Sequence, residues 1–233
     1  MKYITIAAMI IAGAFAAVAG EPATYRLEVQ DFKELKVTDA INVDYVCSPD
    51  SAGWVEFECE PEMASSLLLT NNKSCLHIQV ATEMLDGRSL PTVRVYSSSL
   101  TKVENLADST VRVLSNVPVT SFKARIVGNG TLVVRDVEAI SVDAGIATGK
   151  GHLVISNGKA AKAKLSNVGT GPLEAGGMAV DRLKVMALGT GPVDCWALET
   201  LSLYGAGSCT VYYRGQPEKI TNRSIGVKLV HVD

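Results

Sequence analysis

Residues 169–175 read Gly-Thr-Gly-Pro-Leu-Glu-Ala, and residues 189–195 repeat the pattern as Gly-Thr-Gly-Pro-Val-Asp-Cys. The two copies lie 20 residues apart, and a fixed period of this length is typical of a repeat architecture. In each copy a turn of small residues leads into alternating apolar and polar residues, as in a half-buried strand. Glycine permits a sharp turn, and proline at a corner costs no ladder hydrogen bond. The pair therefore predicts two stacked coils with equivalent corners.

The same spacing extends in both directions from these two copies. Corner positions recur at Ser109, Gly130, Gly151, Gly171, Gly191 and Gly207, with separations of 21, 21, 20, 20 and 16 residues. Two residues after the corners lie Val111, Leu132, Leu153, Leu173, Val193 and Cys209, and four residues after them lie Val113, Val134, Ile155, Ala175, Cys195 and Val211. Six residues before them lie Val103, Ala124, Gly145, Leu165, Val185 and Leu201. We expect each set to form an inward column.

These columns favour a parallel β-solenoid over an antiparallel sandwich. A coil of this length cannot bury its apolar face alone, so neighbouring coils stack into one continuous core. A sandwich also has evenly spaced strands, but it gives no reason for small residues at equivalent corners. We therefore predict an all-β fold, a β-solenoid with rungs of about 20 residues.

The first part of the chain is predicted to add strands and one short helix. Alternating residues predict strands at Leu27 to Val37, Ile41 to Cys47, Trp54 to Glu60 and Cys75 to Val80. Turn-forming residues from Ser48 to Gly53 suggest a hairpin between the second and third of these strands. Pro61 to Thr70 is typical of a helix. Its inward side chains would be Met63, Leu67 and Leu68.

Length and composition indicate one exported domain. The chain has 233 residues, and 22 Lys and Arg face 24 Asp and Glu, so the overall charge gives no footprint for nucleic acid or an anionic membrane. Lys2, the apolar run Ile4 to Ala16 and the small residues Ala17-Val18-Ala19 predict a signal peptide at residues 1–19. Residues 20–233 would then form a single domain without a transmembrane segment, in the periplasm, at the cell surface or outside the cell.

Two stretches resemble a known family. The stretch from Phe32 to Val46, preceded by Asp31 and reading DFKELKVTDAINVDYV, looks like the opening of the secreted bacterial head GIN domain, described as a "putative auto-transporter adhesin". Leu203 to Leu229 contains YGAGSCTVYYRGQPEKITNRSIGV and is similar to the family's ending, a G-x-G corner, an aromatic strand, a G-x-P turn and S-x-G. The resemblance covers nearly the whole mature chain. It implies a right-handed parallel β-helix, secretion in Bacteroidetes-type bacteria and no established enzymatic activity, and it supplies no catalytic residues.

The sequence lacks motifs for catalysis or for a cofactor. His77, His152 and His231 fit no metal-ligand spacing, and no nucleophile elbow or phosphate-binding loop occurs. The repeat places Glu174 and Asp194 at one outward position on successive rungs, about 4.8 Å apart. Their outer neighbours would be Val154 and Thr210, which add no third carboxylate. We expect both carboxylates to extend into water, with a weak cation site as the alternative, because two oxygen donors fall short of a calcium shell.

A group of aromatic residues near the C-terminus is a candidate interaction surface. Tyr204, Tyr212 and Tyr213 lie close to Arg214 in sequence, and Tyr with Arg is enriched at interfaces. The alternative is a cap over the last rung, which every solenoid needs.

The five cysteines are interpreted mainly as buried thiols. Cys195 and Cys209 would face the core two positions out of register, too far apart for a disulfide. A bridge among Cys47, Cys59 and Cys75 stays open. Asp50-Ser51-Ala52 and Asp108-Ser109-Thr110 match a short bacterial O-glycosylation pattern.

The sequence thus favours an exported, adhesin-like binding module without catalytic activity or cofactor. Its partner would be a protein or glycan at the cell surface, with no role for nucleic acid. The alternatives are a carbohydrate-active β-helix enzyme, which would gather carboxylates in a groove, and a structural subunit that assembles with its own copies.

Overall fold

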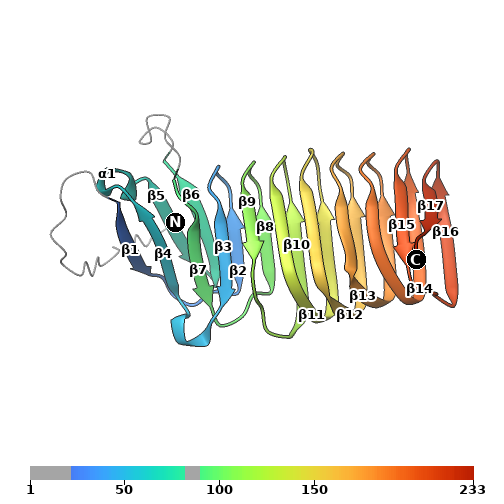
Figure 1. Cartoon of the computed structure of the whole chain (residues 1–233), viewed down its shortest axis with the longest axis horizontal. Helices are drawn as coiled ribbons and strands as arrows, with labels where there is room; N and C mark the ends of the chain where they lie inside the picture. The colour runs from blue at the N-terminus through green and yellow to red at the C-terminus, as the bar shows by residue number, and fades with distance from the viewer. Residues whose placement is uncertain (1–21, 82–89) are drawn as a thin grey trace.

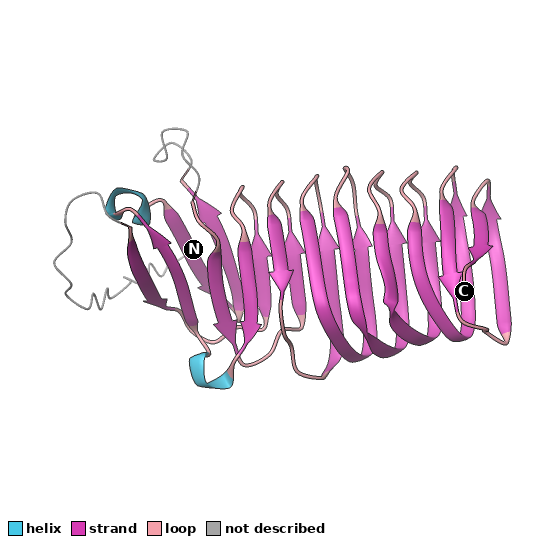
Figure 2. Cartoon of the chain, viewed as in Figure 1, coloured by secondary structure: helices cyan, strands magenta, loops and turns pink. Residues whose placement is uncertain are grey.

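The computed structural model describes residues 22–81 and 90–233, which form an elongated stack of β-coils (Figures 1 and 2). The described residues contain 17 strands, one short α-helix and one 3-10 turn. The predicted all-β solenoid is confirmed, with about six turns. The predicted signal peptide, residues 1–19, lies outside the described residues. In the two described ranges, no helix is long and apolar enough to cross a membrane.

The elements fall into an N-terminal group and a solenoid of longer strands. The first group is β1 (Ala23–Glu28), β2 (Glu34–Val37), β3 (Val43–Cys47), η1 (Pro49–Ser51), β4 (Trp54–Cys59), α1 (Pro61–Ala64), β5 (Leu67–Asn72), β6 (Cys75–Val80) and β7 (Val93–Ser97). The second is β8 (Lys102–Asn105), β9 (Thr110–Val113), β10 (Val119–Ile126), β11 (Thr131–Ile146), β12 (His152–Asn167), β13 (Leu173–Ala187), β14 (Val193–Ala206), β15 (Thr210–Arg214), β16 (Lys219–Ile225) and β17 (Lys228–His231).

Two walls of paired strands enclose the core. The first wall runs in the order β1, β4, β7, β3, β9, β11, β12, β13, β14, β15 and β17. The second wall runs in the order β5, β6, β2, β8, β10, β11, β12, β13, β14 and β16. Strands β11 to β14 belong to both walls: in β11, Thr131–Val134 pairs in the first wall, and the stretch from Ala139 to Ile146 pairs in the second.

Apolar columns between the walls form a continuous core, as the repeat predicts. One fully buried column follows the first wall through Val43, Val111, Leu132, Leu153, Leu173, Val193 and Val211. Each member lies about 4.8 Å from the next, so its side chain contacts those above and below. Burial of this kind, about 25 cal/mol per Å² of apolar surface, stabilises the stack.

One expected column is off by one residue at Gly145. Ala144 pairs with both Ala124 and Leu165, and Gly145 points toward the outer face beside Ser166. Five residues separate β11 from β12, but only four separate β10 from β11. Counting back from the corner at Gly151 therefore gives the wrong member of the column.

The last coil is displaced by two residues from the expected register. The observed pairs are Val193 with Val211, Cys195 with Tyr213, and Val185 with Leu203, in place of Cys209, Val211 and Leu201. Strand β13 bulges between Ala175 and Ala179, and β14 has no matching extra residues there. The coil that follows is therefore shorter, and Gly207 is not the equivalent of Gly191.

The corners are built from close backbone contacts and a buried amide. A Cβ atom at Gly171 or Gly191 would overlap the carbonyl of the corner before it, so only glycine allows this approach. Asn167 is 1% exposed, and its Nδ2 donates to the carbonyl oxygens of Gly171 at 3.0 Å and Gly191 at 3.2 Å. Asn105 does the same at an earlier corner. One amide thus connects two successive corners.

The N-terminal strands differ from the prediction in their pairing. The stretch Leu27 to Val37 forms two strands, and β1 lies in the first wall whereas β2 lies in the second. Strands β3 and β4 do not form a hairpin, because β7 lies between them and pairs with both. Residues Ser48 to Gly53 do form a turn, which contains η1. The strands on either side of it pair with β7, which is distant in sequence, and not with each other.

The predicted helix is wrong beyond its first turn. Helix α1 ends at Ala64, and β5 then forms an antiparallel hairpin with β6. Lys73 and Ser74 have φ of 51° and 63°, the left-handed pair of a tight hairpin turn. Leu67 is buried, but Leu68 is 47% exposed because successive strand residues face opposite sides. A short apolar run does not distinguish helix from strand.

Val185→Asp should prevent folding, because the side chain of Val185 is fully buried between Leu165 and Leu203. Burying an unpaired charge there costs more free energy than the net stability of a single domain. Thermal unfolding followed by circular dichroism measures this, with the outward neighbour Lys184→Asp as the matched control that keeps a cooperative transition. A folded Val185→Asp variant with unchanged Tm would refute the inward column.

Asn167→Asp should lower the free energy of unfolding by about 3 kcal/mol, because a carboxylate replaces the buried donor that serves two corner carbonyls. Urea denaturation gives the value. Thr190→Ala, on an exposed corner position, is the control and should change it by less than about 0.5 kcal/mol. Equal losses in both variants would mean that the amide does not hold the corners.

Candidate functional site

The carboxylates predicted to be neighbours are neighbours, but each has its own cationic or histidine partner. Glu174 and Asp194 pair in register on β13 and β14. Glu174 Oε1 lies 3.0 Å from His152 Nε2, and Asp194 Oδ2 lies 3.0 Å from Arg214 Nη1. Glu174 is exposed to water as expected, whereas Asp194 is partly buried, and the two carboxylates engage separate partners.

The surroundings of Asp194 differ from the predicted ones in two respects. Its neighbour on the last coil is Tyr212, not Thr210, because of the register displacement described above. The guanidinium of Arg214 lies over Gly176, where any Cβ would overlap it, so this glycine leaves room for the ion pair. Oδ1 of Asp194 is buried and has no hydrogen-bond partner in the structure. Within the described ranges, no group of three His, Cys, Asp or Glu side chains could hold a metal.

The four residues of the predicted aromatic surface lie on different walls. Tyr204 belongs to the limb of β14 that pairs with β16, and its ring lies 4.8 Å from Lys184 Nζ. Tyr212, Tyr213 and Arg214 lie on β15 in the first wall. Tyr213 packs against the core, with its ring centroid 5.0 Å from that of His231 on β17. They do not form one patch, and Tyr213 helps to close the end of the stack.

The three buried cysteines are not placed to act as nucleophiles. All five are free, and Cys59, Cys195 and Cys209 are buried. Burial raises the pKa of the Cys195 thiol to about 12, with a smaller contribution from the charge of Asp194. A protonated thiol is neither a nucleophile nor a metal ligand. Cys47, Cys59 and Cys75 lie on β3, β4 and β6, which pair with other strands and not with one another.

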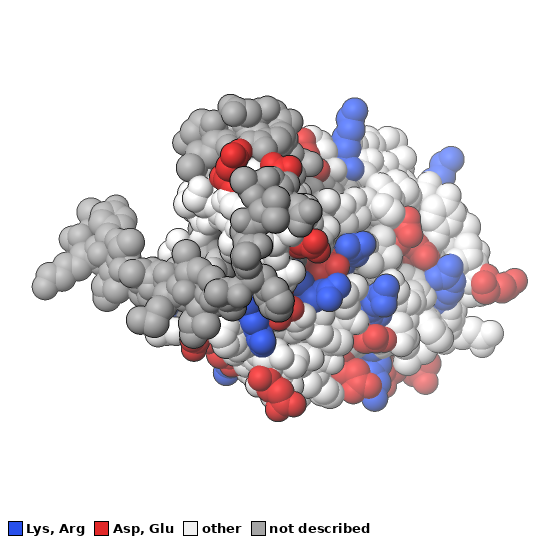
Figure 3. Space-filling view, turned by 60° about the vertical axis from the view of Figure 1, so that its left-hand side comes forward, with Lys and Arg blue, Asp and Glu red and all other residues white. Residues whose placement is uncertain are grey.

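Charges on the first wall balance one another. Its consecutive outward positions carry Arg26, Glu56, Arg94, Asp44 and Arg112. Arg26 Nε lies 3.2 Å from Glu56 Oε1, and Arg112 Nε lies 2.6 Å from Asp44 Oδ1. Acidic and basic side chains are likewise interspersed on the face shown in Figure 3. Cations and carboxylates thus alternate along this part of the first wall, and no row of one sign forms there.

Charges on the second wall do not balance. The four stretches 121–126, 141–146, 162–167 and 182–187 carry six outward cations: Lys123, Arg125, Lys162, Lys164, Arg182 and Lys184. The same stretches carry one carboxylate, Asp143, which lies in register between Lys123 and Lys164. In the part of the chain that the structure describes, Arg182 alone of the six forms an ion pair, at 3.7 Å from Glu199. The wall therefore presents an excess of positive charge.

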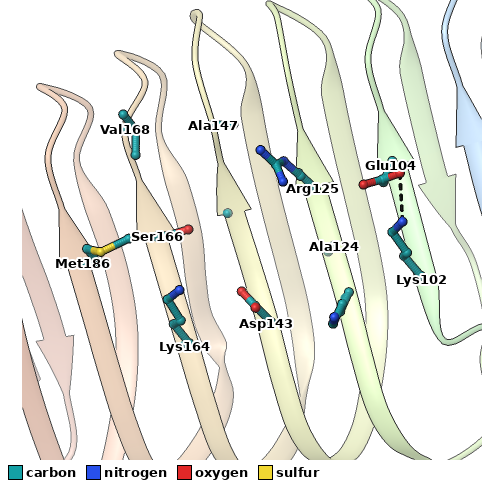
Figure 4. A pocket seen from close by; sticks show the side chains of 12 residues that line it. Lys102, Glu104, Ala124, Arg125, Asp143, Ala147, Lys164, Ser166, Val168 and Met186 are labelled. Atoms are coloured by element: carbon teal, nitrogen blue, oxygen red, sulfur yellow. Dashed lines mark ion pairs between the residues drawn. The ribbon is translucent and has the colours of Figure 1, made fainter.

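A shallow hollow of about 490 Å³ opens in the middle of this basic surface (Figure 4). It is lined by the small residues Gly145, Ala147 and Ser166, by the backbone at Ala124, by Val168 and Met186, and by charged side chains. Figure 4 shows Asp143 and Lys164 projecting from neighbouring strands, with Arg125 across the hollow. Small residues beside long charged side chains leave an open recess for a polar ligand.

At one edge of the hollow, a lysine is held by two carboxylates. Lys102 Nζ lies 3.0 Å from Glu104 Oε2 and 3.5 Å from Glu34 Oε2. Burial alone lowers the pKa of Lys102, but the hydrogen bonds and charges of these carboxylates outweigh it and raise the pKa. Lys102 is thus held by carboxylates, whereas Lys123, Arg125, Lys162 and Lys164 form no ion pair among the described residues.

The sequence contains a pattern that indicates this basic wall, but the search for apolar columns did not consider it. Basic-apolar-basic triplets occur at 123–125, 162–164 and 182–184. Their middle residues are buried, so both basic residues of each triplet face outward. The net charge of the chain does not reveal these triplets, because acidic residues outside the second wall offset their positive charge.

The fold and its two walls define a parallel β-solenoid protein. Residues 31–217 match the family model described as "Putative auto-transporter adhesin, head GIN domain", and the chain belongs to this family. No curated protein matches the chain significantly in sequence.

Solved structures of low sequence identity share the fold. A structure described as a putative adhesin from Bacteroides fragilis NCTC 9343 has a TM-score of 0.80 at 16% identity, over 91% of this chain and 97% of that one. A putative adhesin from Parabacteroides distasonis ATCC 8503 has a TM-score of 0.73 at 22% identity, with the same coverage. Another structure from that organism, described as a putative lipid binding protein, has a TM-score of 0.67 at 15% identity, over 92% and 98%.

Thiol labelling should separate buried from accessible cysteines. At pH 8, iodoacetamide should label native protein at Cys47 and Cys75 at most, because the other three thiols are buried and protonated. In denaturant without reductant, intact mass should show five labels. Three labels would reveal a disulfide and contradict the structure.

Proposed function

We propose that this protein is an exported, non-catalytic binding module of the bacterial cell surface, which contacts its partner through the outer face of the second wall. Membership of the head GIN family and the absence of a membrane-spanning helix in the described residues support this role. The observation that carries the proposal is the charge excess on β10 to β13. Five of its six cations form no ion pair among the described residues, and such an excess of charge attracts an anionic partner.

The arrangement of carboxylates disfavours the enzyme alternative. Glycoside hydrolysis needs two carboxylates on opposite sides of one sugar bond. Asp143 is the one carboxylate of the hollow without an ion pair, because Glu104 is bound to Lys102. Glu174 and Asp194 lie on the other wall with partners of their own. These positions suit contacts to a ligand rather than acid–base catalysis.

The proposal is tested by measuring binding and cleavage together. Mature protein, residues 20–233, is applied to a glycan array and to cell-envelope preparations from Bacteroides, and the same glycans are assayed for new reducing ends. We expect retention without cleavage. New reducing ends would establish the enzyme alternative, and concentration-dependent oligomers that bind nothing would establish the structural subunit.

The double variant Glu174→Gln, Asp194→Asn should keep its binding within about threefold, because both residues lie on the first wall. Loss of the pair with Arg214 should cost about 1 kcal/mol of stability, as for a partly exposed ion pair. The affinity is measured on the surface identified by the array. A larger loss with the fold intact would move the binding site to the first wall.

A further inference from the structure

The second wall has a regular arrangement of charge along the solenoid axis. Lys123, Asp143, Lys164 and Lys184 occupy one outward row on successive strands β10 to β13. Neighbouring strands lie about 4.8 Å apart, so this row presents charges at a constant interval. Regular spacing along one axis suits a linear polymer whose charges also recur at intervals.

From this row and the hollow beside it we infer that the second wall binds a linear anionic polysaccharide, one whose sugars carry carboxylate or sulfate groups. The inference rests on the proposed function and names the partner's chemistry. Six cations on β10 to β13 would pair with the anionic groups. The hollow of about 490 Å³ is of a size that holds a small polar ligand unit.

The polar residues of the hollow match a sugar better than a bare polyanion. Asp143 lies between the cations and accepts hydrogen bonds, which sugar hydroxyls donate and phosphodiesters do not. Ser166, which also lines the hollow, both donates and accepts. Carboxylates among cations thus fit a chain on which anionic groups alternate with neutral, hydroxyl-bearing units.

The same features disfavour single-stranded nucleic acid. Binding of unpaired bases depends on exposed aromatic rings along the path. On the second wall from β8 to β14, Tyr204 is the single aromatic residue at the described outward positions. Its ring is covered by Lys184.

The test measures the affinity of the mature chain for defined probes. The probes are hyaluronate, in which carboxylate-bearing and neutral sugars alternate, and heparin as anionic polysaccharides, dextran as a neutral one, oligo-dT as nucleic acid, and phosphatidylglycerol vesicles as an anionic lipid surface. We expect binding to the two anionic polysaccharides that weakens as salt increases, with no measurable binding to dextran.

A charge-reversal variant locates the site. Lys164→Glu, Lys184→Glu should lower the affinity for both anionic polysaccharides at least tenfold, because two members of the row become repulsive. Lys150→Glu, Lys228→Glu changes net charge equally at exposed positions, at a corner and on β17, and should stay within about twofold. Circular dichroism checks that both variants fold.

Each other outcome overturns the inference. Equal losses in both variants would mean attraction by net charge without a site. Tighter binding to oligo-dT or to the vesicles would assign the wall to nucleic acid or lipid. Binding of a neutral glycan on the array, unaffected by Lys164→Glu, Lys184→Glu, would refute the anionic polysaccharide and leave the proposed function standing. The proposed function itself fails if no array glycan and no envelope preparation retains the protein.

Discussion

Close backbone approach at the corners sets the register of the middle coils. Gly171 and Gly191 lie against the carbonyls of the preceding corners, and the amide of Asn167 joins successive corners from inside the core. A shift of one residue would place a Cβ where a carbonyl lies and would turn each inward side chain outward. The corners thus decide which residues form the core and which form the two walls.

The fold class was predictable because the repeat is encoded in local residue types. The identical Gly-Thr-Gly-Pro corners and the alternating residues after them are enough to predict stacked parallel coils. The exact register was not, because the bulge of β13 between Ala175 and Ala179 changes a coil's length without changing its appearance in sequence. Pairing of β7 between β3 and β4 depends on contacts far apart along the chain.

The candidate site was less predictable because it depends on the distribution of charge, not its sum. The chain has a formal net charge of −2, yet the first wall alternates its charges and the second wall gathers cations. The prediction of adjacent Glu174 and Asp194 is confirmed, but the sequence did not show that His152 and Arg214 would engage them. Such partners lie diagonally across coils. A repeat register identifies lateral neighbours and misses diagonal contacts.

Hydrogen–deuterium exchange of residues 20–233, with and without an anionic oligosaccharide, tests the central claim most directly. If the second wall is the binding surface, added protection should appear in 123–125, 143–147, 162–166 and 182–186, the stretches that line the hollow and carry its cations. The first-wall stretches of the same strands, such as 131–134 and 152–155, serve as internal references and should not change. Protection confined to the first wall or to β15 and β17 would contradict the account.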